Sequence, residues 1–265
     1  MELQRVVKIR SSFSLAIRLI DAFTGGAPLG SGTEVALAGA LRKPVRKEGG
    51  LFVFTDIAEG VYTLEVKSDV YFAESLQVTA GGAGVGEVHA VPLIPLPLYP
   101  FPPGATLFRA CLRDETGRPL AGARVTASLL SEDCCRARVA EDEAVKGKTE
   151  IAVANLTSPV RSGDAFTLQG RTAKESELCE IASELKEPGR YRLVSPLKHG
   201  HKRGAMLLPV VRTRSDERGE IAVVFPPGRV KAFEAELRIE DGKRTDVRQM
   251  LMNEGSTLNM GTLRL

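Results

Sequence analysis

The sequence predicts an all-β protein with two β-sandwiches in tandem and a small β-barrel-like domain inserted in the second one. Its 265 residues include 26 glycines and 15 prolines but no tryptophan. This composition favours many short strands joined by tight turns over long helices. Short segments of alternating apolar and polar residues recur along the chain, and one pattern occurs twice. A chain of this length is also expected to form more than one domain.

The first half of the repeated pattern covers residues 15–39 and again residues 106–130. In both copies an alternating strand leads to an aspartate, a Thr-Gly pair and a Pro-Leu pair, and a second alternating strand follows. Asp21 and Asp114 provide acceptor side chains for the turn, and the following glycine tolerates positive φ. Each copy is therefore expected to begin with two strands joined by a tight connection.

The second half of the pattern covers residues 49–78 in the first copy and residues 218–243 in the second. In the first copy we expect one strand from the alternation of Leu51 and Val53, and another from residues 61–66. The two halves of the second copy are separated by a long additional segment. Loop tips tolerate such insertions, because loop-closure entropy grows only slowly with length.

These patterns predict the domain organisation. The expected divisions are a first sandwich with an N-terminal arm at 1–90, a rigid proline-rich linker at 91–104, a second sandwich at 105–130 and 214–265, and an inserted β-rich domain at 131–213.

The repeated motif resembles the carboxypeptidase regulatory-like, or transthyretin-like, β-sandwich family. The match covers residues 15–78 and, less closely, residues 106–130 together with 218–265. The resemblance implies two seven-stranded, immunoglobulin-like sandwiches. It also implies that the modules have no catalytic residues of their own and serve as spacers, stalks or adaptors.

The inserted segment has its own pattern, in which Gly163-Asp164 precedes a strand and Pro196-Leu197 precedes His201 and Gly204. It resembles a small β-barrel-like repeat of phage tail and cell-surface proteins. This resemblance implies an all-β insert. A short helix over residues 175–185, with Glu175, Glu177 and Glu180 on its solvent-facing side, is the alternative interpretation.

The connector VPLIPLPLYPFPPG (residues 91–104) is both stiff and apolar. Proline excludes a helix or a central strand here, and polyproline-type geometry makes the segment rigid. We expect its apolar side chains, Leu98 and Tyr99 among them, to lie against the sandwiches and fix their angle.

Enzymatic chemistry is not expected, and no catalytic, cofactor-binding or metal-binding residues are predicted. Common catalytic signatures such as Gly-x-Ser-x-Gly and His-Glu-x-x-His are absent from the sequence. His199 and His201 share one face if they lie on a strand, and two such histidines can share a metal. Lys198, Lys202 and Arg203 surround them, however, so a solvated basic turn is the favoured interpretation. The four cysteines fit neither a zinc site nor a disulfide framework.

Protein partners are predicted instead, namely other subunits of an assembly, itself included. The net charge of +3 is too small to indicate a nucleic-acid partner. No apolar run is long enough to span a membrane, and the N-terminus does not resemble a signal peptide, so cytoplasmic synthesis is expected. Two contact regions are predicted, an arm suited to β-augmentation and a basic loop suited to an acidic partner. The predicted contact residues are Glu2, Leu3, Gln4, Arg5, Val6, Val7 and Lys8 in the arm, and Arg42, Lys43, Arg46 and Lys47 in the loop.

The predicted function is that of a non-catalytic structural or adaptor subunit. A phage-tail-like contractile injection particle, assembled in the cytosol and released by lysis, fits the resemblances and the absence of an export signal. The alternative is a carbohydrate- or cell-surface-binding module. The lack of tryptophan weakens this alternative, since sugar sites use aromatic platforms.

Overall fold

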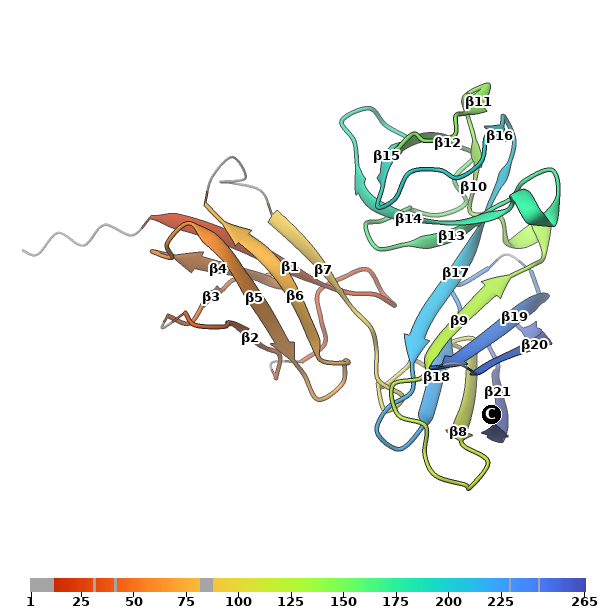
Figure 1. Ribbon diagram of the computed structural model, residues 1–265, viewed down its shortest axis with the longest axis horizontal. Helices are drawn as coiled ribbons and strands as arrows, with labels where there is room; N and C mark the ends of the chain where they lie inside the picture. Colours follow the sequence, from red (N-terminus) through yellow and green to blue (C-terminus); the bar gives the residue numbers. More distant parts are fainter. Residues whose placement is uncertain (1–11, 31, 41, 82–87, 229, 243) are drawn as a thin grey trace, which may run out of the picture. The chain divides into compact units, whose positions relative to one another are not determined.

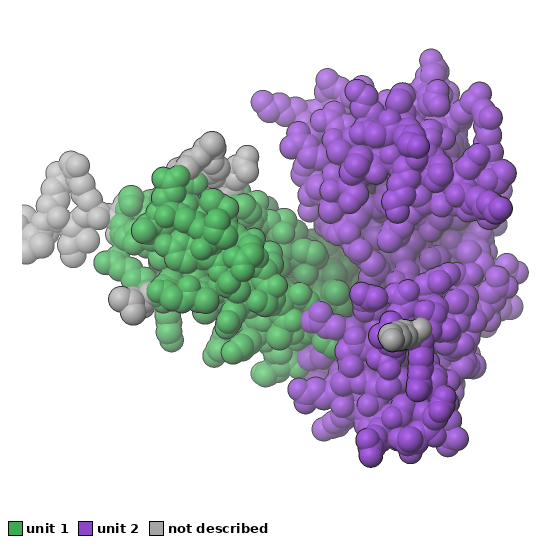
Figure 2. All heavy atoms as spheres, in the orientation of Figure 1, with its two compact units in different colours: residues 1–94 green, residues 95–265 purple. Residues whose placement is uncertain are grey.

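A computed structural model describes residues 12–30, 32–40, 42–81, 88–228, 230–242 and 244–265. The chain divides into two compact units, residues 1–94 and residues 95–265 (Figure 2). Both units are built of β-strands arranged in several sheets (Figure 1), which confirms the predicted all-β class. In the described ranges, no helix is long and apolar enough to cross a membrane.

The first unit is a seven-stranded sandwich. One sheet has the order β3-β4-β1-β7 and the other has the order β2-β5-β6. Apolar residues from both sheets, such as Ile17, Phe54 and Leu64, are fully buried between them. The strands are β1 (Phe13–Asp21), β2 (Glu34–Leu37), β3 (Val45–Arg46), β4 (Leu51–Thr55), β5 (Gly60–Lys67), β6 (Glu74–Ala80) and β7 (Val88–Leu93).

The strand predicted from Leu51 and Val53 exists as β4, but Phe52 and Phe54 are the residues that face the core. Phe52 is 5% exposed and Phe54 is 1% exposed, whereas Leu51 and Val53 are only half-buried. All four residues are apolar, so alternation alone cannot select the inward face. A shift of one residue exchanges the two faces of a strand.

The second unit contains a sandwich with the same connectivity. A three-stranded sheet, β18-β8-β21, faces the strands β17-β9-β19-β20 of a larger sheet. Residues Phe108, Val125, Val223 and Leu237 belong to one buried core. The strands are β8 (Leu107–Arg113), β9 (Arg124–Leu129), β17 (Met206–Arg214), β18 (Glu220–Val224), β19 (Ala232–Asp241), β20 (Arg244–Asn253) and β21 (Thr257–Arg264).

The repeat in the sequence is therefore also a repeat of topology. In each sandwich the first strand pairs antiparallel with one strand and parallel with the last strand. In the first unit, β1 pairs antiparallel with β4 and parallel with β7. In the second unit, β8 pairs antiparallel with β18 and parallel with β21. Three further strands of each sandwich form the second sheet, β2-β5-β6 in one unit and β9-β19-β20 in the other. The seventh strand differs, because β3 pairs with β4 in the first sheet, whereas β17 pairs with β9 in the second. The inserted segment occupies the connection from β9 to β18, which corresponds to the short connection from β2 to β4.

The insert forms a closed barrel of six strands in the order β10-β12-β15-β14-β13-β17, and β17 pairs back to β10. It has a buried core of its own, which includes Ile151, Phe166 and Leu193. Residues 177–184 form a strand, so the alternative of a helix in this region is wrong. The barrel strands besides β17 are β10 (Ala137–Val139), β12 (Glu150–Ala154), β13 (Ala165–Leu168), β14 (Glu177–Glu184) and β15 (Arg190–Leu193), and a two-stranded ribbon is formed by β11 (Glu143–Ala144) and β16 (His201–Lys202).

Strand β17 belongs to both the barrel and the second sandwich. Its first half pairs with β13, from Leu207 to Val210, and its second half pairs with β9, from Val210 to Arg214. The predicted boundary at residue 213 therefore falls inside a strand. One continuous strand links the barrel to the sandwich sheet (Figure 1).

The proline-rich segment does not form a uniform linker. Residues 91–93 complete the edge strand β7, a position where Pro92 is tolerated. Further along, Tyr99 is buried and its ring lies 4.8 Å from that of Phe101. The Arg109 guanidinium donates to the carbonyl oxygen of Pro97 at 2.8 Å. Leu98 is 63% exposed, so the expectation that its side chain is packed is wrong.

Candidate partner-binding site

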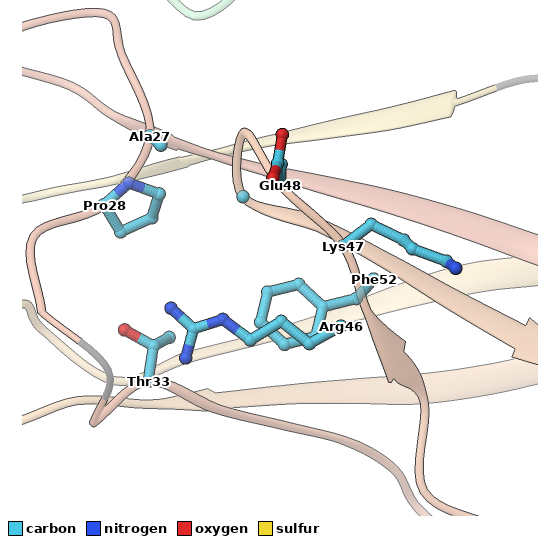
Figure 3. A pocket seen from close by; sticks show the side chains of 8 residues that line it. Ala27, Pro28, Thr33, Arg46, Lys47, Glu48 and Phe52 are labelled. Carbon is cyan, nitrogen blue, oxygen red and sulfur yellow. The ribbon is translucent and has the colours of Figure 1, made fainter.

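The first sandwich contains a pocket of about 460 Å³ beside the short edge strand β3 (Figure 3). This volume is within the range of small-molecule and side-chain sites, roughly 300–1,000 Å³. Its lining is mixed, with a buried phenyl ring, a proline ring, a hydroxyl group and charged side chains. The lining residues are Ala27, Pro28, Thr33, Arg46, Lys47, Glu48, Gly50 and Phe52.

The wall of the pocket depends on a close approach between the turn at residues 47–50 and strand β1. The Gly50 carbonyl oxygen accepts a hydrogen bond from the Leu19 N–H at 2.9 Å. A Cβ atom at Gly50 would lie 2.6 Å from the Leu19 carbonyl oxygen and 2.9 Å from Pro28 Cδ, and the φ of Gly50 is +73°. Only glycine fits there, because a side chain would collide with backbone atoms and require the left-handed region.

Arg46 is the cation that reaches across the pocket. Figure 3 shows its guanidinium extending toward Thr33, whereas Lys47 points away from it. One Nη of Arg46 donates to the Gly30 carbonyl oxygen at 3.1 Å, and its guanidinium carbon lies 5.8 Å from the centre of the Phe52 ring. The aromatic face and the carbonyl hold the positive charge at a fixed place. Glu48 also lines the pocket.

Thr33 adds a hydroxyl group to the pocket lining. The residue is 6% exposed, and its Oγ1 has no hydrogen-bond partner among the residues that the structure describes. A buried hydroxyl without a partner costs about 1–3 kcal/mol.

The structure brings together only part of the predicted basic loop. Arg46 and Lys47 line the pocket, but Arg42 forms an ion pair with Asp56 at 2.6 Å and Lys43 is exposed away from the lining. The predicted arm residues, Glu2 to Lys8, lie outside the described residues. Sequence reasoning missed Thr33 and Phe52, since neither belongs to a motif.

His201 is buried, so the predicted solvated basic turn is wrong for this residue. Its side chain is fully inaccessible in the barrel, with Nε2 2.9 Å from Glu177 Oε1 and Nδ1 3.2 Å from the Gln169 carbonyl oxygen. A carbonyl oxygen only accepts, so Nδ1 carries a proton. Both ring nitrogens are thus engaged with the chain itself. His199 contributes only its backbone, whose N–H donates to Glu177.

Glu177 holds this part of the barrel together. Its carboxylate accepts hydrogen bonds from His201 Nε2 and from the backbone N–H groups of Lys198 and His199. Burial by itself would raise the pKa of Glu177, but these hydrogen bonds outweigh burial and lower the pKa. The ionised carboxylate is therefore the form that the barrel requires. It fastens the loop before β16 to the start of β14.

Within the described ranges, no group of three or more His, Cys, Asp or Glu side chains is placed to hold a metal ion. The thiols of Cys134 and Cys179 are buried, and burial raises their pKa values to about 11 and about 12. Such thiols are poor nucleophiles at neutral pH.

No family model matches the chain, and no curated protein matches it. A 9R-lipoxygenase from Cyanothece aligns with 10% identity and a TM-score of 0.23, over 63% of this chain but only 17% of the lipoxygenase. A streptococcal ancillary pilin aligns with 9% identity and a TM-score of 0.26, over 96% of this chain and 69% of the pilin. The major pilin subunit of Bacillus cereus aligns with 9% identity and a TM-score of 0.25, over 94% and 70% of the two chains. At these TM-scores the alignments carry no argument about fold or function.

Proposed function

We propose that the protein is a non-catalytic structural or adaptor subunit of a protein assembly, and that its first sandwich binds an acidic side chain of a partner. The observation that carries this proposal is the pocket in which the Arg46 guanidinium and the buried Thr33 hydroxyl lie on the same side. The positive charge of the Arg46 guanidinium attracts a carboxylate, and hydrogen bonds between these two charged groups are stronger than bonds between neutral groups.

The apolar part of the pocket suits the rest of an acidic side chain. Phe52 and Pro28 offer a ring face and a proline ring beside the polar groups. The methylene groups of a glutamate can pack there while its carboxylate reaches Arg46. A glutamate-rich peptide segment is therefore the ligand class that the lining fits.

The use of buried polar groups elsewhere supports a structural role. In the first sandwich, Asp21 accepts hydrogen bonds from the Phe23 N–H and the Tyr71 hydroxyl, and that hydroxyl accepts from the Leu29 N–H. In the barrel, Glu177 and His201 bind the chain's own backbone. These groups fix loops in place, as a scaffold requires.

The resemblance of the repeats to the carboxypeptidase regulatory-like family favours the adaptor class. The resemblance of the insert to phage-tail repeats favours a contractile injection particle as the assembly. Cytoplasmic synthesis followed by release through lysis is part of the same proposal.

The binding proposal is tested by fluorescence anisotropy with a labelled hexaglutamate peptide and the full chain. Arg46→Gln should weaken binding about tenfold or more, because a hydrogen bond to a charged group contributes about 1.5–3 kcal/mol. Arg42→Gln is the matched control, because it removes the same charge from a residue paired with Asp56. Equal losses for Arg46→Gln and Arg42→Gln, or no binding at low salt, would reject the site.

A further inference from the structure

Strand β20 is the outermost strand of the large sheet in the second unit and has an unusually regular edge. All ten of its residues pair with β19 without a bulge, from Asn253 opposite Ala232 to Arg244 opposite Asp241. It contains no proline. Three other edge strands that the structure describes are short or interrupted, since β3 has only two residues, β7 contains Pro92 and the ladder of β21 has a register shift. Strand β6 is a regular edge as well, but it has seven residues against ten in β20.

The hydrogen-bond pattern identifies which residues of β20 point their backbone groups outward. The Glu254 N–H donates to the Lys231 carbonyl oxygen, one step beyond the strand in the same register. Even-numbered residues are therefore bonded to β19, and odd-numbered residues direct N–H and C=O away from it. None of the described residues pairs with this outer edge. The outward residues inside the strand are Thr245, Val247, Gln249 and Leu251.

The same odd-numbered residues have exposed side chains, and two of them are large and apolar. Val247 is 44% exposed and Leu251 is 62% exposed. On the opposite face, the half-buried Asp246 and Arg248 neutralise each other across 2.5 Å. The edge therefore lacks the net inward charge that often prevents strand pairing.

We propose that β20 pairs antiparallel with β20 of a second copy of this chain, with Gln249 on the two-fold axis. This register places Val247 of each copy opposite Leu251 of the other in a hydrogen-bonded pair. The two exposed apolar side chains then cover each other on one face. The interface is isologous, as in most symmetric dimers, and joins the two large sheets into one.

Charge disfavours one of the two neighbouring registers. The ladder between the two copies forms only when odd-numbered residues of one β20 lie opposite odd-numbered residues of the other. In one neighbouring register of this kind, Arg248 instead of Gln249 lies on the two-fold axis. That arrangement places Arg248 opposite the same arginine of the second copy, which is destabilising. With Gln249 on the axis, Arg244 lies opposite Glu254 of the second copy.

This inference rests on the proposed function, because it takes the protein to be an assembly subunit and a second copy of the chain to be one of its partners. It is tested with the full chain by sedimentation velocity and by oxidative cross-linking. The wild type should sediment as a dimer, and Gln249→Pro should be monomeric. This substitution removes an outward N–H without removing a bond to β19.

Cross-linking tests the register. Gln249→Cys should form a disulfide-linked dimer under mild oxidation, because Cα atoms in a hydrogen-bonded pair are about 5.5 Å apart. Thr245→Cys is the matched control. Thr245 lies opposite Asn253 of the second copy, so two Thr245 positions are about 27 Å apart and should not cross-link. The wild-type chain, with its four cysteines, gives the background.

A wild type that stays monomeric at high concentration, or equal cross-linking of the two cysteine variants, would overturn the interface. Hexaglutamate binding is measured on the same samples. Loss of the dimer with intact peptide binding would reject this inference alone, and loss of peptide binding with an intact dimer would reject only the acidic-partner site.

Discussion

The buried pair of Glu177 and His201 gives the sharpest prediction about the stability of the barrel. Replacing Glu177 with glutamine keeps the shape of the side chain but removes its charge. The carboxylate accepts from His201 Nε2 and from two backbone N–H groups, one on Oε2 and one on Oε1. An amide has only one oxygen, so its NH₂ group must face at least one of these donors.

The expected cost follows from these contacts. Loss of a charge-assisted hydrogen bond costs about 1.5–3 kcal/mol, and a buried donor without a partner costs about 1–3 kcal/mol. A total near 3 kcal/mol corresponds to about a hundredfold increase in the population of the opened barrel, at about 1.4 kcal/mol per factor of ten.

Hydrogen exchange followed by mass spectrometry measures this opening locally. Peptides from β13 to β17 should lose about a hundredfold in protection, at roughly 1.4 kcal/mol per factor of ten, while peptides from the first sandwich should not change. Glu180→Gln is the matched control on the same strand. Glu180 pairs with Arg212 at 2.8 Å, but both side chains are about one-third exposed, so its loss should cost less than about 1 kcal/mol. Indistinguishable protection in the two variants would refute the reasoning.

Three further predictions concern pH, a glycine and the thiols. The pKa of Glu177 is lowered in the folded barrel, so its contribution to stability should be complete above the unfolded value near 4.5 and should disappear as the pH falls through the lower, folded pKa. Urea titrations at acid pH should show this loss of stability in the wild type but not in Glu177→Gln. Gly50→Ala should destabilise the first sandwich by about 3 kcal/mol or more, because the new Cβ would collide with backbone atoms. Gly49→Ala, at φ +69° with open space around the position, should cost only about 1–2 kcal/mol. Coinciding thermal unfolding curves for the two variants would contradict this difference. Cys134 and Cys179 should resist alkylation at pH 8 until the chain is unfolded, and mass mapping that finds either one modified as fast as the more accessible Cys111 would argue against their burial.

The sequence by itself determined the strand content and the repeated topology. Turn residues and alternating patterns are local signals, so Asp21, Asp114 and the glycines after them mark the same connection in both sandwiches. The sequence also indicated where the insertion lies, because the second copy of the repeated pattern is interrupted at that loop.

Tertiary structure decided the inward faces, the site and the role of the histidine. β4 is apolar on both faces, and only packing against the opposite sheet selects Phe52 and Phe54 over their neighbours. Thr33 and Arg46 line one pocket because the segment just before β2 lies near β3, and His201 is buried where Glu177, 24 residues earlier, supplies an acceptor. These contacts join residues far apart in the chain. Their burial and pairing depend on closure of the sheets, which no local pattern encodes.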